Sequence, residues 1–217
     1  MNRGYHEIKE HGKREFPFNI YPCSIPVDFS HVALHWHEEM EIIAVKKGKG
    51  RITVDTVSYP VEEGDILAVF PGQLHAISCG NGERMEYENI IFRLSMLMGD
   101  NGDGCTVHFL KPLQEGQAKN PVLIQRNQPD HEVFGKVIQE LDRFSEIRGN
   151  GYQLAVKGQL FCFCIMLMAE ASCLQRRSRD MQERKSRGYW STSGNILGKR
   201  LRSGRRQSCA FTVSPTL

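Results

Sequence analysis

Apolar and polar residues alternate along much of residues 31–124. At Val32, Leu34 and Trp36, for example, every second position carries a large apolar side chain. A period of two is typical of strands that bury one face. Turn signals that contain glycine interrupt this region at residues 47–50, 62–65, 71–72, 80–82 and 101–104. Many short strands separated by such turns predict a β-sandwich or β-barrel.

The pattern changes to a helical period after Pro129. Asp130 is a suitable N-cap, and the apolar positions after it form one stripe. That stripe consists of Phe134, Val137, Ile138, Leu141 and Phe144. Glycines at residues 149–151 are expected to end this helix. A second helix is predicted over residues 152–175, and its centre, residues 160–168, is apolar on every side.

A helix that is apolar all round must be covered on several faces. Two antiparallel helices would cover one face of the β-domain, and a second subunit would cover the helices in turn. We therefore expect residues 130–175 to mediate dimerisation. The side chains expected to contribute are Phe134, Val137, Ile138, Leu141, Phe144, Leu160 and Phe161.

Residues 176–217 are rich in Arg, Ser and Gly and follow no sustained period, which predicts an unstructured tail. From Gln175 onward the chain carries eleven Lys or Arg and two Asp or Glu, so the net charge of +3 hides an acidic folded part. Any contact with nucleic acid must therefore involve the tail. Because a disordered basic arm binds phosphates without reading bases, we do not expect sequence-specific DNA binding by this chain alone.

The length of 217 residues suits one main domain with an attachment. Residues 1–15 lack the apolar stretch of a secretory signal peptide. The longest apolar run, residues 160–169, is about half the ~20 residues that a membrane-spanning helix needs. The seven cysteines include no Cys-x-x-Cys pattern and are expected to be reduced thiols. These features predict a cytoplasmic protein without a membrane segment.

Four residues form the candidate chemical site. His35 and His37 are two positions apart in an expected strand, so their side chains share one face. Glu41 follows four residues later, before a hairpin expected at Gly48, and His75 comes from a distant strand. Three imidazole nitrogens and a carboxylate oxygen suit a divalent metal such as zinc, iron(II), nickel or manganese.

The same four residues also suit a pocket that binds a small molecule without a metal. Histidines on strands are often only hydrogen-bonded, so these residue types alone do not require an ion. We expect His35, His37, Glu41 and His75 to bind a small-molecule ligand, with a divalent metal in the same pocket as the alternative. No other cofactor and no catalytic residue are indicated, since the chain lacks a P-loop, a dinucleotide-binding glycine pattern and Gly-x-Ser-x-Gly.

The spacing His35-x-His37-x3-Glu41-x6-Gly48 resembles the first motif of the cupin family, with every interval intact. The resemblance implies a mainly β fold, a double-stranded β-helix barrel. We place this barrel at residues 21–125, after an N-terminal arm at residues 1–20.

The second cupin motif is matched in part. Gly64, Gly72 and His75 fall at the family's spacing. Phe70 stands where that motif usually has proline, and Cys79 replaces its usual asparagine. The histidine expected to bind a metal is present, while its loop departs from the family pattern.

The order of the elements over about residues 15–175 is similar to the sensory half of AraC-type transcription regulators. The similarity is carried by an arm with Tyr21-Pro22, the strand with His35 and His37, and a helix that starts with Gly-Tyr-x-Leu at residues 151–154. It implies a cupin domain that binds a small effector, such as a sugar. It also implies helices that form a homodimer, or a heterodimer with a full-length regulator.

Members of that family continue with two helix-turn-helix units of ~100 residues, whereas 42 residues follow Gln175 here. We interpret residues 176–217 as a disordered basic tail, or as the product of a frameshift near Arg184. The leading hypothesis is thus a non-catalytic, effector-sensing and dimerisation module of an AraC-like regulator. The alternative is a small metal-dependent cupin enzyme, an oxygenase or isomerase.

Overall fold

The computed structural model describes residues 3–100, 102–115 and 120–189. The chain divides into two compact units, Met1–Leu167 and Met168–Leu217. The eight strands are β1 (Phe18–Ile25), β2 (Val32–His35), β3 (Met40–Val54), β4 (Val57–Glu62), β5 (Ile66–Val69), β6 (His75–Ser78), β7 (Met85–Phe92) and β8 (Val122–Ile124). The helices are η1 (Arg3–Tyr5), η2 (Leu94–Leu97), η3 (Thr106–Leu110), α1 (Lys111–Gln114), α2 (His131–Ile147) and α3 (Tyr152–Tyr189).

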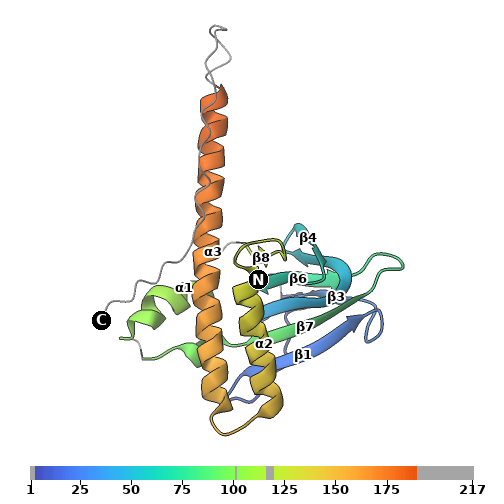
Figure 1. Cartoon of the computed structure of the whole chain (residues 1–217), viewed down its shortest axis with the longest axis vertical. Helices are drawn as coiled ribbons and strands as arrows, with labels where there is room; N and C mark the ends of the chain where they lie inside the picture. Colours follow the sequence, from blue (N-terminus) through green and yellow to red (C-terminus); the bar gives the residue numbers. More distant parts are fainter. Residues whose placement is uncertain (1–2, 101, 116–119, 190–217) are drawn as a thin grey trace. The chain divides into compact units, whose positions relative to one another are not determined.

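The strands of the first unit form two antiparallel sheets joined by the long strand β3. One sheet has the order β1-β7-β3-β5-β8, and the other has the order β2-β6-β3-β4 (Figure 1). This arrangement is a double-stranded β-helix, as the sequence predicts, and two helices follow it. Because β3 belongs to both sheets, residues at its start and end face the same interior.

The expected hairpin at Gly48 is wrong, because β3 continues through it. The register against β7 shifts between Val45 and Lys47, so a bulge bends the strand from one sheet into the other. Gly48 has a positive φ of 77°, and a Cβ there would overlap the carbonyl oxygen of Arg84. The glycine therefore marks a bend within a strand rather than its end.

Two further segments differ from the predicted elements. β1 is a full strand paired with β7 along its length, although Pro22 and its polar neighbours hide the period of two. Residues 94–114 hold short helical turns in place of strands. β1 lies beside the long strand β7, whose pairing overrides the weak local pattern of β1.

The barrel interior is an apolar core of side chains from both sheets. Its members are Ile25, Ile43, Val45, Ile52, Val54, Val61, Leu67, Val69, Ile77, Met85 and Tyr87. The alternate residues of β3, Met40, Ile42 and Ala44, are buried on the outer face. α2 covers that face, where Lys46 of β3 contacts Asp142 of α2 (Figure 1).

α2 and the first part of α3 form the predicted antiparallel pair. Phe134 near the start of α2 packs edge-on against Phe163 in α3, with ring centroids 5.3 Å apart. Asp130 lies at the expected N-cap position of α2, but its side chain makes no capping hydrogen bond. α2 ends at Ile147, next to the glycine-rich turn.

α3 runs to Tyr189, so the expectation of an unstructured chain is wrong for residues 176–189. That stretch is rich in Arg, Gln, Glu, Lys and Met, which are good helix formers. A sequence without an apolar period can still be helical when its residues favour the helix. The remainder of the expected tail, residues 190–217, lies outside the described residues.

One segment, Tyr152–Glu170 of α3, is long and apolar enough to cross a membrane by length and composition, with a mean hydropathy of 1.4. No such segment was predicted from the sequence, because the longest apolar run is only about half the required length. The core helix of a globular protein passes the same test, and Val156, Leu160, Phe163 and Leu167 of this helix are buried in the first unit.

Candidate functional site

The four predicted site residues converge at one end of the barrel. His35 ends β2 and is the direct cross-strand partner of His75, which begins β6. His37 follows β2, and Glu41 lies near the start of β3. One ligand atom from each residue lies within 4.8 Å of those of the other three. We call these residues the His–Glu cluster; the structure brings all of them together, while their binding role stays a prediction.

Backbone carbonyls fix the orientation of the three imidazoles. The Nδ1 atoms of His35, His37 and His75 lie 2.8, 3.2 and 2.9 Å from the carbonyl oxygens of residues 33, 39 and 73. Since a carbonyl oxygen only accepts, each Nδ1 must carry a proton and donate it. Every ring therefore turns Nε2 toward the interior of the site.

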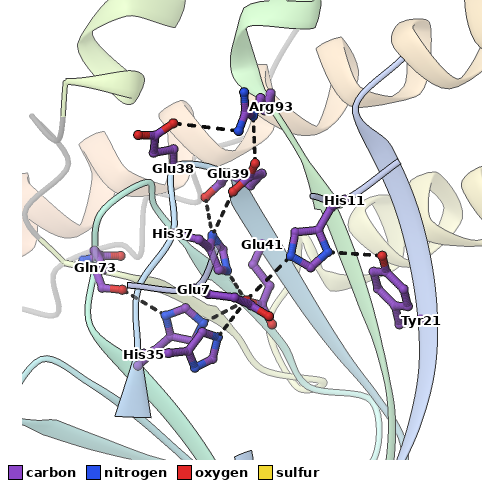
Figure 2. A network of polar contacts seen from close by, with 11 residues as sticks. Glu7, His11, Tyr21, His35, His37, Glu38, Glu39, Glu41, Gln73 and Arg93 are labelled. Atoms are coloured by element: carbon purple, nitrogen blue, oxygen red, sulfur yellow. Dashed lines mark hydrogen bonds and ion pairs between the residues drawn. The ribbon is translucent and has the colours of Figure 1, made fainter. Parts of the chain in front are cut away.

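The Glu41 carboxylate sits between two of these nitrogens (Figure 2). Its Oε2 lies 3.0 Å from Nε2 of His37 and 2.8 Å from Nε2 of His75. A neutral imidazole that donates through Nδ1 offers only a lone pair at Nε2, which repels a carboxylate oxygen. The contacts therefore require a proton or a cation between the atoms, and the donor set fits a divalent ion.

Burial and charge shift the titration of the cluster. Burial would raise the pKa of Glu41, but the charges and hydrogen bonds of His75 and His37 outweigh it and hold that pKa well below its ordinary value. Burial would lower the pKa of His75, but Glu41 outweighs it and raises that pKa. For His35, burial and the charge of His75 lower the pKa. Without a bound cation, Glu41 and His75 thus each favour the charged form of the other, while burial and His75 favour the neutral form of His35.

A second layer of charge holds His37 in place. Arg93 after β7 donates from Nε to Glu39 Oε1 at 2.8 Å, and the other oxygen of Glu39 lies 3.7 Å from Nδ1 of His37. Figure 2 shows this chain of contacts leading from Arg93 down to Glu41. Glu39 is buried, so its charge needs the guanidinium beside it.

Beside the cluster lies a cavity of about 440 Å³, which we call the barrel cavity. His35 and Glu41 form one wall, and Tyr87 and Asn89 of β7 form another. The side-chain oxygen of Asn89 is buried and has no hydrogen-bond partner among the described residues, and the buried hydroxyl of Tyr87 has only the weakly hydrogen-bonding Cys23 thiol of β1 beside it. Orphaned polar atoms of this kind are costly unless a ligand or water satisfies them.

Several residues that line the barrel cavity are not among those predicted from the sequence. Tyr87 and Asn89 occupy alternate, inward positions of β7, so polar residues at the buried phase of a strand were the available signal. Glu7 and His11 also line the cavity, but they come from an N-terminal segment without a period. A larger cavity of about 710 Å³ lies outside the barrel, against β1, β7 and α2, and contains no member of the cluster.

The expected dimerisation residues fall into two groups. Phe134, Val137, Ile138, Leu141 and Leu160 are buried within the chain. Phe144 is half-buried beneath the Arg143 guanidinium, and Phe161 is exposed. Their role in a dimer stays a prediction.

A double-stranded β-helix with three histidines and a glutamate at one end defines a cupin domain. The family described as "AraC-like ligand binding domain" matches residues 26–158, which is more than half of the chain. The chain belongs to this family.

A curated relative is the uncharacterized HTH-type transcriptional regulator YdeC of Bacillus subtilis (strain 168), 27% identical over 88 residues. The match covers 40% of this chain and 30% of the relative, so the chain spans about a third of that protein's length. Among solved structures, a cupin protein from Bacteroides fragilis is 25% identical over 40% of this chain and 70% of its own, with a TM-score of 0.30. Bacillus subtilis oxalate decarboxylase, with Mn(II) centres, is 25% identical over 29% of this chain and 18% of its own, with a TM-score of 0.27.

Proposed function

We propose that this chain is the effector-binding and dimerisation part of an AraC-like transcription regulator. Its small-molecule effector binds in the barrel cavity against His35 and Glu41. The observation that carries this proposal is the buried, unpartnered side-chain oxygen of Asn89 beside the Tyr87 hydroxyl, which has only the Cys23 thiol as a neighbouring partner; both residues line the same cavity as the His–Glu cluster. A ligand with hydroxyl groups could form hydrogen bonds with the polar side chains on both walls of the cavity at once.

The charges around the cavity favour an uncharged effector. Glu7, Asp28 and Glu41 line it, and Lys9 is the single lysine or arginine among its lining residues. An anion would therefore meet a net negative wall, whereas a neutral polyol such as a sugar exchanges hydrogen bonds without that penalty.

Thermal unfolding in the presence of candidate effectors tests this proposal. Neutral pentoses and hexoses form one arm, and sugar phosphates and sugar acids form the other. We expect a neutral compound to raise the midpoint in proportion to its affinity, and His35→Ala to abolish that rise. A rise with the anionic arm alone would contradict the proposed chemistry.

The dimer forms, in this proposal, through the outer face of α3. Leu154, Phe161 and Ile165 are 77%, 41% and 61% exposed. At about 100° per residue they project within about 40° of one another, opposite the buried face of the helix. Such a stripe supports a helix–helix contact with a second copy, as in a family whose ligand-binding domains dimerise.

Sedimentation equilibrium tests the dimer. We expect Phe161→Glu to give a monomer at a concentration where the unaltered chain is dimeric. Val57→Glu is the control, because Val57 of β4 is equally apolar and 50% exposed but lies outside the helices. A monomeric unaltered chain, or an unaltered dimer in Phe161→Glu, would refute the contact.

The proposed function also includes a partner protein, the absence of sequence-specific DNA binding and a location in the cytoplasm. A heterodimer with a full-length regulator through residues 130–175 would be detected by coprecipitation with that regulator. We infer that the chain alone does not read a DNA sequence and acts in the cytoplasm. Preferential retardation of one DNA sequence at physiological salt would contradict the first of these two inferences.

A second candidate function is that of a metal-dependent cupin enzyme, an oxygenase or isomerase. It is favoured by the three Nδ1-anchored imidazoles whose Nε2 atoms gather with Glu41 within 4.8 Å. A divalent ion bound there would supply Lewis-acid or redox chemistry. Stoichiometric iron, manganese or nickel in freshly purified protein would support this candidate, and protein purified without metal would exclude it.

A further inference from the structure

The N-terminal segment reaches the His–Glu cluster by adding to the end of β2. Its backbone pairs with Trp36, because the Trp36 amide donates to Tyr5 and the Glu7 amide donates to Trp36, at 2.9 and 3.0 Å. The His6 ring stacks on the Trp36 indole at a centroid distance of 4.2 Å. These contacts place Glu7 beside the His–Glu cluster, where its side chain approaches His35.

The Glu7 carboxylate faces two imidazoles (Figure 2). Its Oε2 lies 3.6 Å from Nε2 of His35 and 3.6 Å from Nε2 of His11. His35 already donates through Nδ1 to the carbonyl of residue 33, so its Nε2 presents a lone pair toward Glu7. The Glu7 oxygen and the His35 Nε2 are then both hydrogen-bond acceptors, so a cation between or beside them would relieve their repulsion.

We propose that Glu7 is a fifth ligand of a divalent ion held by the His–Glu cluster, and that the ion thereby fastens the N-terminal segment to the barrel. This inference rests on the second candidate above, an ion in the cluster. Two ligand atoms at right angles, each about 2.1 Å from one ion, are about 3 Å apart. Relative to His35 the carboxylate of Glu7 needs a shift of about half an ångström, and since Glu7 lies outside the group of ligand atoms within 4.8 Å of one another, its side chain must also rotate toward the other three ligands.

Charge balance supports the same assignment. Three neutral imidazoles and the Glu41 carboxylate leave a divalent ion with one uncompensated positive charge in a buried site. A second carboxylate removes it. Glu39, the other buried glutamate nearby, is held by Arg93 at 2.8 Å and is directed toward Nδ1 of His37, so Glu7 is the carboxylate that can reach the ion.

The test is titration of the metal-stripped full chain with Co²⁺, followed by calorimetry and by visible absorption. The variants are Glu7→Gln and, as the matched control, Glu10→Gln, an exposed glutamate of the same segment. We expect Glu7→Gln to weaken Co²⁺ binding by about 10-fold or more and to change the absorption spectrum, while Glu10→Gln matches the unaltered chain. Equal affinity and an identical spectrum in Glu7→Gln would overturn the inference.

The rate of trypsin cleavage after Lys9 shows whether the ion holds the N-terminal segment against the barrel. Lys9 lies in the same segment, with its ammonium group 4.6 Å from the centre of the Tyr21 ring. We expect saturating Co²⁺ to slow this cleavage in the unaltered chain and in Glu10→Gln, but not in Glu7→Gln. Equal protection in all three would overturn the inference.

Absence of Co²⁺ binding to the unaltered chain would overturn the inference together with the metal candidate. That result would leave the effector proposal standing, because the effector is detected separately by the thermal shift with neutral sugars. Glu7→Gln keeps the size of the side chain, and an unchanged unfolding midpoint without metal confirms that it folds.

Discussion

Oε2 of Glu41 lies 2.8 Å from Nε2 of His75, although the two residues are 34 positions apart in the chain. Glu41 pairs within one sheet, and His75 pairs within the other. Both side chains are almost completely buried. The polar centre of the site therefore also ties the two sheets of the barrel together.

Removal of the His75 imidazole should destabilise the fold as well as the site. His75→Ala leaves the buried Glu41 charge with His37 alone, and breaking a buried ion pair costs about 3 kcal/mol or more. His35→Ala should cost about 1 kcal/mol or less, because Glu41 keeps both of its partners. Urea denaturation measures the free energy of unfolding of both variants. Equal decreases would contradict the claim that the contact between Glu41 and His75 stabilises the fold.

Gly48 and Gly82 form a matched pair of glycines with positive φ, 77° and 75°. At Gly82 an added Cβ meets nothing, so Gly82→Ala should cost about 1 kcal/mol for the backbone conformation alone. At Gly48 the Cβ would overlap the Arg84 carbonyl, and Gly48→Ala should cost about 3 kcal/mol or more. Similar losses in denaturation experiments would show that the bend of β3 tolerates a side chain.

Asp142 and Glu88 share one ammonium group, since Lys46 Nζ lies 3.1 and 2.6 Å from their carboxylates. Burial raises the pKa of Asp142 above its ordinary value, Glu88 adds to the rise, and Lys46 opposes it. The folded state thus binds this proton more tightly than the unfolded state. The contribution of Asp142 to stability is therefore greatest at low pH and falls as pH rises through the ordinary and then the raised pKa.

Asp142→Asn removes this titration. Relative to the unaltered chain, the variant should gain stability as pH rises above the ordinary value of 3.8, and the gain should level off once the raised pKa is passed. Urea denaturation of both proteins from pH 3.5 to pH 7 measures the difference. A variant that loses relative stability with rising pH would show that Lys46 dominates the carboxylate instead.

The two faces of the helical pair should respond differently to truncation. Leu141 of α2 is completely buried, so Leu141→Ala should cost about 2 to 5 kcal/mol. Leu154→Ala on the exposed face should change the stability of the monomer by about 0.5 kcal/mol or less. Denaturation at a protein concentration below the dissociation constant of the dimer measures the stability of each variant as a monomer. A large loss of stability in Leu154→Ala would place that residue in the intramolecular core.

The period of two predicted a sandwich or barrel, and the resemblance to the cupin motif, which depends on the spacing of His35, His37, Glu41 and His75, implied the double-stranded β-helix and its site. His35 and His37 share a face in any extended strand, and the amphipathic stripe of α2 is unambiguous. The bend at Gly48 was not predictable, because a turn signal looks the same whether the chain reverses or a bulge redirects the strand. Glu7 was not predictable either, since its segment is ordered by backbone pairing with Trp36 rather than by an apolar pattern.

The role of Tyr87 in the candidate site was not predictable from the sequence either. Its phenol looks like a core aromatic in the sequence, and most of the ring does pack in the barrel core. Its importance comes from the buried hydroxyl, which borders a cavity and has only the Cys23 thiol as a hydrogen-bonding neighbour. Only the three-dimensional arrangement distinguishes that hydroxyl from one satisfied by a neighbouring strand.

The most direct test of the effector site is thermal unfolding of the unaltered chain and Tyr87→Phe with and without neutral sugars. A thiol is a weak hydrogen-bonding partner, so Tyr87→Phe should be about as stable as the unaltered chain without ligand. The rise in midpoint produced by the effector should be lost or sharply reduced, because the ligand no longer has that hydrogen bond to make. An undiminished ligand-induced rise in Tyr87→Phe would contradict the assignment of the barrel cavity as the effector site.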